Sequence, residues 1–281
     1  TDGAFGYDTP SEFSKANPAL QAIATDLAIA NNLSNVQLVH SHTWYANMAG
    51  HTASLLYGIP HIVSAHSLEP LRPWKSEQLG GGYRISSWAE KTAYEAAAAI
   101  IAVSDGMRAD VLKAYPAIDP AKVVTIRNGV DTNKFAPNHD TSVPESFGIS
   151  GPYAIFVGRI TRQKGLAHLL RAWKDVPAEY GLVLAAGSPD EEGIGNEVAA
   201  LIAELQKERS NVWWIKDMLP HDQLTAMLTA ADLFVCPSIY EPLGIVNLEA
   251  MGCETAVLGS RVGGIPEVVA DKETGELVDY N

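Results

Sequence analysis

Cysteine is nearly absent from the 281-residue sequence, which contains only Cys236 and Cys253. Both residues lie in apolar surroundings, LFVCPS and AMGCET. Two such cysteines cannot form the disulfide framework of a small secreted protein. The low cysteine content therefore excludes that class and favours a reducing compartment, so we expect a cytoplasmic protein.

Basic residues are also scarce, because 20 Lys and Arg face 33 Asp and Glu and leave a net charge of -13. A surface of this sign repels polyanions, so we expect no nucleic acid as a partner. Long apolar runs are missing as well. The longest aliphatic stretch, Ala96–Val103, is far too short to span a bilayer, and the opening residues TDGAFGYDTP show no signal peptide. Because no apolar stretch is long enough to span a bilayer, we expect no membrane association. The lack of a signal peptide does not bear on this expectation, since the chain resembles a fragment.

What the sequence does contain is a regular alternation of short apolar runs and helical segments. In the first half, strands are expected at residues 36–42, 61–67, 100–105 and 122–128. Helices are expected at Pro18–Asn31, Trp44–Tyr57, Arg84–Ala98 and Gly106–Tyr115, where apolar residues recur at helical spacing.

The second half repeats this alternation. Its expected strands are residues 153–158, 181–187, 211–216, 232–238 and 254–260. Its expected helices are Gly165–Lys174, Glu191–Arg209, His221–Ala230 and Leu243–Met251.

Strands that alternate with helices predict parallel sheets with right-handed crossover connections. The proline-containing stretch Pro137–Gly151 between the two halves is typical of a linker. We therefore expect an α/β fold of two Rossmann-like domains, residues 1–137 and 138–281, with parallel sheets that face a cleft. Ligands of such sheets gather at the carboxyl ends of the strands.

A basic loop follows the first strand of the second half. The segment GRITRQKG (158–165) combines Gly158 with the cations Arg159 and Lys164. Free amides at a helix start attract phosphate, so this loop is a candidate phosphate cradle. It is not a Walker loop, because Lys164 precedes Gly165 and no Ser or Thr follows. The alternative is an ordinary loop with solvated basic side chains.

Two acidic residues flank the start of a helix near the expected strand 232–238. Glu241 lies in the loop and Glu249 within the helix that we expect from Leu243. The amides of Leu243, Gly244 and Ile245 would point at a ligand beside Glu241. A carboxylate only accepts hydrogen bonds, so it suits a row of sugar hydroxyls. The alternative is a capping acid followed by a surface acid.

Histidine ends a strand in the first half, at His66, and Glu69 follows it. A histidine can bind sugar hydroxyls or a leaving group near neutral pH, although a lone histidine is more often structural. His40 and His42 lack a third ligand nearby, so a metal site is a weak interpretation.

These elements together resemble the retaining GT-B glycosyltransferases of family four, which include sucrose-phosphate synthases and many mannosyltransferases. The resemblance is carried by GRITRQKG (158–165), the Glu241–Glu249 pair, NGVDTNKF (128–135) and GGIPEVV (263–269). The stretches at 65–83 and 187–193 are similar to the actinobacterial group of glycogen synthases and maltose-1-phosphate synthases.

The resemblance implies a hexosyltransferase that moves glucose from ADP-glucose, with retention, to an α-1,4-glucan or to glucose 1-phosphate. It implies that the first domain is the acceptor side and the second binds the nucleotide sugar. Its catalytic residues would be His66, Arg159, Lys164 and Glu241. Its donor-binding residues would be Gly158, Arg159, Lys164, Gly187, Leu243, Gly244, Ile245, Val246 and Glu249.

Metal-independent chemistry without a cofactor is also implied, because the sequence contains no D-x-D motif. A homodimer is compatible with the sequence. Nothing before Pro18 supplies the family's opening glycine-rich loop, and the sequence stops at Asn281 before its closing helices. We therefore expect a chain that lacks the N-terminal βα unit and the C-terminal helices. Domain closure would occur about the linker near Asn138 and exclude water.

Three other functions stay open from the sequence. One is a transferase with a UDP- or GDP-sugar donor and a small-molecule or lipid acceptor, although the basic residues of 1–137 form no run that would favour a membrane surface. The second is a nucleotide-sugar epimerase, and the third is a non-catalytic binding fragment.

Overall fold

The computed structural model describes residues 8–279, apart from the side chains of Glu77 and Gln78. Residues 1–7, at which no signal peptide was predicted, lie outside the described part. The chain divides into two compact units, Thr1–Arg127 and Asn128–Asn281. The expected boundary after residue 137 differs from this division only in residues 128–137, which the contacts place in the second unit.

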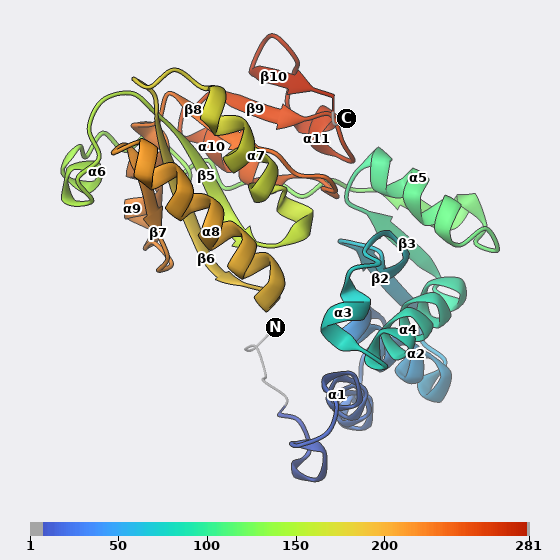
Figure 1. Ribbon diagram of the computed structural model, residues 1–281. Coiled ribbons are helices and arrows are strands. Elements are labelled where there is room, and N and C mark those ends of the chain that lie inside the picture. The colour runs from blue at the N-terminus through green and yellow to red at the C-terminus, as the bar shows by residue number, and fades with distance from the viewer. Residues whose placement is uncertain (1–7, 280–281) are drawn as a thin grey trace. The chain divides into compact units, whose positions relative to one another are not determined.

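The first unit is built on a parallel sheet with the strand order β1-β2-β3-β4. Within the described residues its strands are β1 (Val39–His42), β2 (His61–Ala65), β3 (Ala99–Ala102) and β4 (Val123–Thr125). Its α-helices are α1 (Pro18–Asn32), α2 (Trp44–Tyr57), α3 (Lys75–Leu79), α4 (Gly82–Ala96) and α5 (Asp105–Ala114). Three short 3-10 helices are η1 (Ser11–Phe13), η2 (Glu69–Leu71) and η3 (Pro120–Lys122). Helices α1, α2 and α4 pack against one another, as Figure 1 shows.

Local chemistry explains the ends of these helices. The side chain of Asn17 accepts a hydrogen bond from the amide of Ala19 and caps α1, and Pro18 takes the first helical position. Gly58 ends α2 with a φ of 62°, a left-handed conformation in which glycine has no steric penalty.

The second unit contains a larger parallel sheet with the strand order β10-β9-β8-β5-β6-β7. Its strands are β5 (Tyr153–Ile160), β6 (Gly181–Pro189), β7 (Val212–Ile215), β8 (Leu233–Cys236), β9 (Val257–Ser260) and β10 (Gly275–Val278). Its α-helices are α6 (Ser142–Ser146), α7 (Leu166–Ala172), α8 (Glu192–Glu208), α9 (His221–Thr229), α10 (Ile245–Gly252) and α11 (Ile265–Val268). Two 3-10 helices, η4 (Arg162–Lys164) and η5 (Trp173–Asp175), flank α7.

Apolar side chains cover both faces of this sheet. One core joins α7 and α8 to β5 and β6 through residues such as Leu170, Leu184 and Val198. The other joins α9, α10 and α11 to the sheet through residues such as Met227 and Ile265. Figure 1 shows α7 and α8 together on one side of the sheet. Burial on both faces is what the continuous apolar runs of the sequence predicted.

The segment between the two sheets is held at both ends. On the first unit, the amide of Ile126 donates to the carbonyl oxygen of Ala102 at 2.9 Å, and Arg127 forms an exposed ion pair with Asp105. On the second unit, the amide of Phe135 bonds to the carbonyl oxygen of Asp131, and Phe135 packs against the second core. The side-chain amide of Asn138 donates to the carbonyl oxygen of Asp222 at 2.9 Å, which fastens this residue to α9.

The α/β fold of two Rossmann-like units with parallel sheets is confirmed. Across residues 8–279, every helix is too short or too polar to cross a membrane.

Candidate functional site

The basic loop that follows β5 is packed directly on the loop that follows β8. Gly165 has a φ of 65°, and a Cβ at this position would lie 1.9 Å from the carbonyl oxygen of Pro237. The amide of Ile239 donates to the carbonyl oxygen of Gln163 at 2.9 Å. The hydroxyl of Thr161 accepts from the amide of Lys164 and caps η4. Only glycine at position 165 permits this close approach of the two loops. The approach sets the position of the neighbouring residue, Lys164.

The side chains of Lys164 and Glu241 meet as a result. The Nζ atom of Lys164 lies 2.7 Å from Oε2 of Glu241, and their side chains are 20% and 10% exposed. The hydroxyl of Ser238 donates to the same oxygen at 3.1 Å. Oε1 of Glu241 has no hydrogen-bond partner among the described residues. This oxygen and its lone pairs therefore stay available for hydroxyl donors.

The backbone of Glu241 is held from the other side by the segment GGIPEVV. Gly263 has a φ of 53°, and a Cβ there would lie 2.0 Å from the carbonyl oxygen of Glu241. The amide of Gly264 donates to that oxygen at 2.9 Å. Two glycines that the sequence resemblance singled out thus position the acidic residue.

Helix α10 begins at Ile245, two residues after the expected start at Leu243. The cause is Gly244, whose φ of 87° is not helical and whose carbonyl oxygen accepts from the amide and the side chain of Asn247. Because the helix starts at Ile245, the amides of Gly244, Ile245 and Val246 lie in the turn that opens it, and the Leu243 side chain before them is buried.

Glu249 lies in the second turn of α10, where the charge of Lys164 acts on its carboxyl group. Burial raises the pKa of the Glu249 carboxyl, and the charges of His221 and Lys164 oppose this shift. Lys164 therefore acts on both acidic residues that the sequence singled out.

Arg159 is placed differently from Lys164. Its guanidinium binds both carboxylate oxygens of Asp190, at 2.7 and 3.0 Å. The Arg159 side chain is 71% exposed and that of Asp190 27%, and an ion pair that water reaches in this way is worth little. A phosphate could therefore compete with Asp190 for Arg159 at a small cost.

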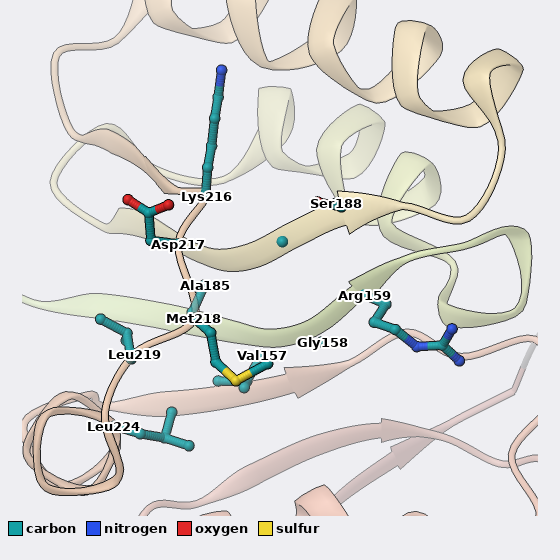
Figure 2. Close-up of a pocket in the computed structure, with 11 residues that line it drawn as sticks. Val157, Gly158, Arg159, Ala185, Ser188, Lys216, Asp217, Met218, Leu219 and Leu224 are labelled. Atoms are coloured by element: carbon teal, nitrogen blue, oxygen red, sulfur yellow. The ribbon is translucent and has the colours of Figure 1, made fainter. Parts of the chain in front are cut away.

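A cavity of about 550 Å³ opens at the carboxyl ends of β5, β6 and β7. Its lining includes three residues predicted as donor-binding, Gly158, Arg159 and Gly187. Apolar side chains such as Val157 and Leu219 form most of the remaining wall. Figure 2 shows Arg159 at one end of the cavity and Leu219 and Leu224 at the other. This is the position at which open parallel sheets bind ligands.

Sequence reasoning missed several residues of this region. Ser238 supports Glu241, and Ser188, Lys216, Asp217 and Met218 line the cavity. Lys216 extends away from Met218 in Figure 2, with its Nζ 4.2 Å from the centre of the Trp214 ring. All of these positions lie at or directly after the last residue of a predicted strand, so the rule that ligands gather there could have found them.

His66 lies in the first unit, directly after β2. Its Nε2 atom is 2.8 Å from Nδ1 of His42. Burial lowers the pKa of His66, and the charges of His42 and His40 lower it further. The ring is thus mainly neutral near pH 7 and can accept or donate a hydrogen bond. The residues predicted to bind the donor all lie in the second unit.

A metal site is not formed by the described residues. Within 8–279, no group of three His, Cys, Asp or Glu side chains is arranged to hold an ion.

Comparison with known proteins identifies both units. Residues 6–134 match the family described as Glycosyltransferase Family 4, and residues 143–281 match Glycosyl transferases group 1. The chain is 54% identical to an alpha-maltose-1-phosphate synthase of Mycolicibacterium smegmatis, over 100% of this chain and 74% of that enzyme.

Two further proteins are similar over most of the chain. A D-inositol 3-phosphate glycosyltransferase of Catenulispora acidiphila is 32% identical over 86% of this chain and 58% of its own length. The solved structure of a sucrose-phosphate synthase from Thermosynechococcus elongatus superposes with a TM-score of 0.77 at 25% identity, and it covers 99% of this chain and 68% of the other.

Proposed function

The chain belongs to the family 4 glycosyltransferases, and we propose that it transfers glucose from ADP-glucose to glucose 1-phosphate to form maltose 1-phosphate. The observation that carries this proposal is the 54% identity, over the whole chain, to an enzyme named for that product. Two more distant relatives are also named for a phosphorylated sugar or polyol. An α-1,4-glucan is the alternative acceptor.

The donor's place in this proposal is the carboxyl edge of the second sheet. The cavity beside Gly158, Arg159 and Gly187 offers an apolar wall for the base and a cation near its mouth for a phosphate. The amides of Ile245 and Val246 at the start of α10 point toward a diphosphate. Glu249 accepts hydrogen bonds from the ribose hydroxyls.

Glu241 and Lys164 act on the transferred glucose. Because Oε2 of Glu241 is bound to Lys164 and Ser238, Oε1 is the atom that accepts the glucose 3- and 4-hydroxyls. Charge develops on the β-phosphate of the leaving ADP, and the ammonium group of Lys164 stabilises it, together with Arg159. A positioned donor of this kind contributes about 3–4 kcal/mol to the transition state.

His66 acts on the acceptor side in this scheme, where its neutral ring binds the glucose 6-hydroxyl near the reacting face. We propose that the acceptor hydroxyl attacks on the same face that the phosphate leaves. This attack gives retention and uses Glu241 for positioning only. The charges assigned here come from side chains, so the proposed reaction proceeds without a metal ion or cofactor.

One product analysis tests the proposal. The protein is incubated with ADP-glucose and either glucose 1-phosphate or maltodextrin, with and without EDTA, and products are identified by NMR. The expected product is α-configured maltose 1-phosphate, at an unchanged rate in EDTA. A lengthened glucan as the product would identify the glucan as the acceptor in place of glucose 1-phosphate. Turnover only with UDP- or GDP-glucose would show that ADP-glucose is not the donor. A β-linked product, an epimerised donor or no turnover with any donor would overturn the proposal.

A further inference from the structure

The first unit contains two buried carboxyl groups that the proposed mechanism does not use. Glu69 in η2 is 0% exposed and Glu90 in α4 is 1% exposed. Burying a carboxyl group is costly unless it is well paired. Two buried carboxyl groups in neighbouring elements therefore point to a structural role, which their contacts should reveal.

Glu90 connects three elements through one oxygen. Its Oε1 accepts a hydrogen bond from the backbone amide of Glu69 at 2.8 Å. The same oxygen accepts from the hydroxyl of Tyr115, which follows α5. The partner ring of Tyr94 lies 5.6 Å from that of Tyr115 and closes the site from α4. Helix α4 is thereby joined to η2 and to the end of α5.

Glu69 in turn contacts residues that follow it in the segment and residues of α4. Its carboxylate binds Arg72 at 2.6 Å and Lys75 at 3.6 Å. Its other oxygen accepts from the hydroxyl of Ser86 at 2.7 Å, and its carbonyl oxygen accepts from the hydroxyl of Tyr83 at 2.8 Å. Both hydroxyls come from α4, so three contacts tie this short segment to a helix of 15 residues.

The segment that is held in this way, residues 66–75, contains side chains that can bind a sugar phosphate. It begins with His66 at the carboxyl end of β2 and ends with the cations of Arg72 and Lys75. Residues 66–75 contain these two cations and one carboxylate, that of Glu69, so the segment itself has a positive net charge in an acidic protein. A segment with little regular structure needs such anchoring if it is to present groups to a substrate.

We propose that Glu90 is a positioning residue that acts through Glu69 to hold residues 66–75 in the geometry required for acceptor binding. This inference rests on the proposed function, because it assigns the segment to the sugar-phosphate acceptor. Glu90 itself touches no substrate. The interaction that matters is its acceptance of the Glu69 amide and the Tyr115 hydroxyl.

Glu90→Ala and Glu90→Gln test this proposal, with Glu95→Ala as the control on the same helix, where Glu95 pairs with Lys91 at the surface. Glu90→Ala should raise the KM for glucose 1-phosphate by about tenfold or more, while the affinity for ADP stays within about twofold. Glu90→Gln should restore the acceptor KM to within about threefold, because an amide oxygen accepts the same two hydrogen bonds. Glu95→Ala should match the wild type.

Hydrogen exchange gives a second, activity-independent readout. Peptides that cover residues 66–75 should exchange faster in Glu90→Ala than in the wild type, whereas those of the second unit should not change. If Glu90→Ala does not fold, Tyr115→Phe removes one bond to the same oxygen and should show a smaller change in the same direction.

Several results would overturn the inference. One is an unchanged acceptor KM with unchanged exchange in 66–75, and another is equal impairment of the Gln and Ala variants. A loss of ADP affinity in step with acceptor affinity would indicate a merely structural role. If the wild type transfers glucose to no acceptor, the proposed function fails, and the exchange experiment still decides whether Glu90 holds the segment.

Discussion

Replacing Lys164 by Met separates the ion pair that this cation forms from the catalytic role that we propose for it. The change keeps most of the side-chain volume and removes the charge that pairs with Glu241. A matched control is Lys174→Met in η5, because Lys174 lies at the same 2.7 Å from its partner Glu204 but in an exposed pair, with side chains 37% and 51% exposed.

The magnitude follows from burial. The Lys164–Glu241 side chains are 80–90% withdrawn from water, so loss of the cation leaves the carboxylate with Ser238 as its remaining hydrogen-bond donor. Breaking a buried pair on one side costs about 3–5 kcal/mol, and we expect about 3 kcal/mol here because some solvent remains. The Lys174 variant should be indistinguishable from the wild type, because water screens an exposed pair.

Denaturant unfolding measures the stability effect, and initial rates of glucose transfer measure the catalytic one. Lys164→Met should lower kcat by about a hundredfold or more if the cation stabilises the leaving phosphate. The double variant with Glu241→Gln removes both charges, so it should regain most of the stability and none of the activity. Equal stability of the Lys164 and Lys174 variants, or activity that returns with stability in the double variant, would refute the reasoning.

Two further substitutions test other parts of the structure. Gly263→Ala would place a Cβ 2.0 Å from the carbonyl oxygen of Glu241 and should lower both the activity and the thermal midpoint. The control Gly193→Ala, in open space in α8, should change neither. Equal behaviour of the two variants would contradict the role assigned to Gly263. Burial raises the pKa of Asp26 from 3.8 to about 7, although hydrogen bonds from the amides of Met48 and Ala49 act to lower it. Ionisation of Asp26 therefore lowers the free energy of unfolding only as the pH rises through this range. Asp26→Asn should therefore gain up to about 4 kcal/mol of unfolding free energy at about pH 8 and almost nothing at about pH 4, and an equal gain at both would contradict the sign.

Much of the fold was predictable because periodicity and stop signals agree. Helix α2 has the bounds expected from the sequence, Trp44–Tyr57, since Gly58 marks its end. Among the α-helices and strands of the described residues, four were not predicted: α3, α6, α11 and β10. Helix α6 lies in the proline-containing linker, where composition suggested no regular structure. The other three have four or five residues each, too few for a periodic pattern to appear.

The candidate site was predictable in its parts but not in its connections. Residue types and strand ends indicated Lys164 and Glu241, and the structure brings these two side chains together. The partner of Arg159 is Asp190, far along the sequence, and nothing in the sequence pointed to that ion pair. Similarly, the left-handed Gly244 that delays α10 depends on its contact with Asn247, which a periodic pattern does not reveal.

The contacts at the two ends of the connecting segment limit the length of free chain between the two units of the enzyme. The amide of Ile126 bonds to the carbonyl oxygen of Ala102 in β3, and the chain is fixed again at Phe135. Even fully stretched, the chain between these two residues spans less than about 33 Å. Any pivot must lie within this stretch, ahead of the fastened Asn138. Because this connection is so short, any step of the proposed reaction that needs groups from both units is intramolecular, at an effective concentration that dilution of the protein does not change.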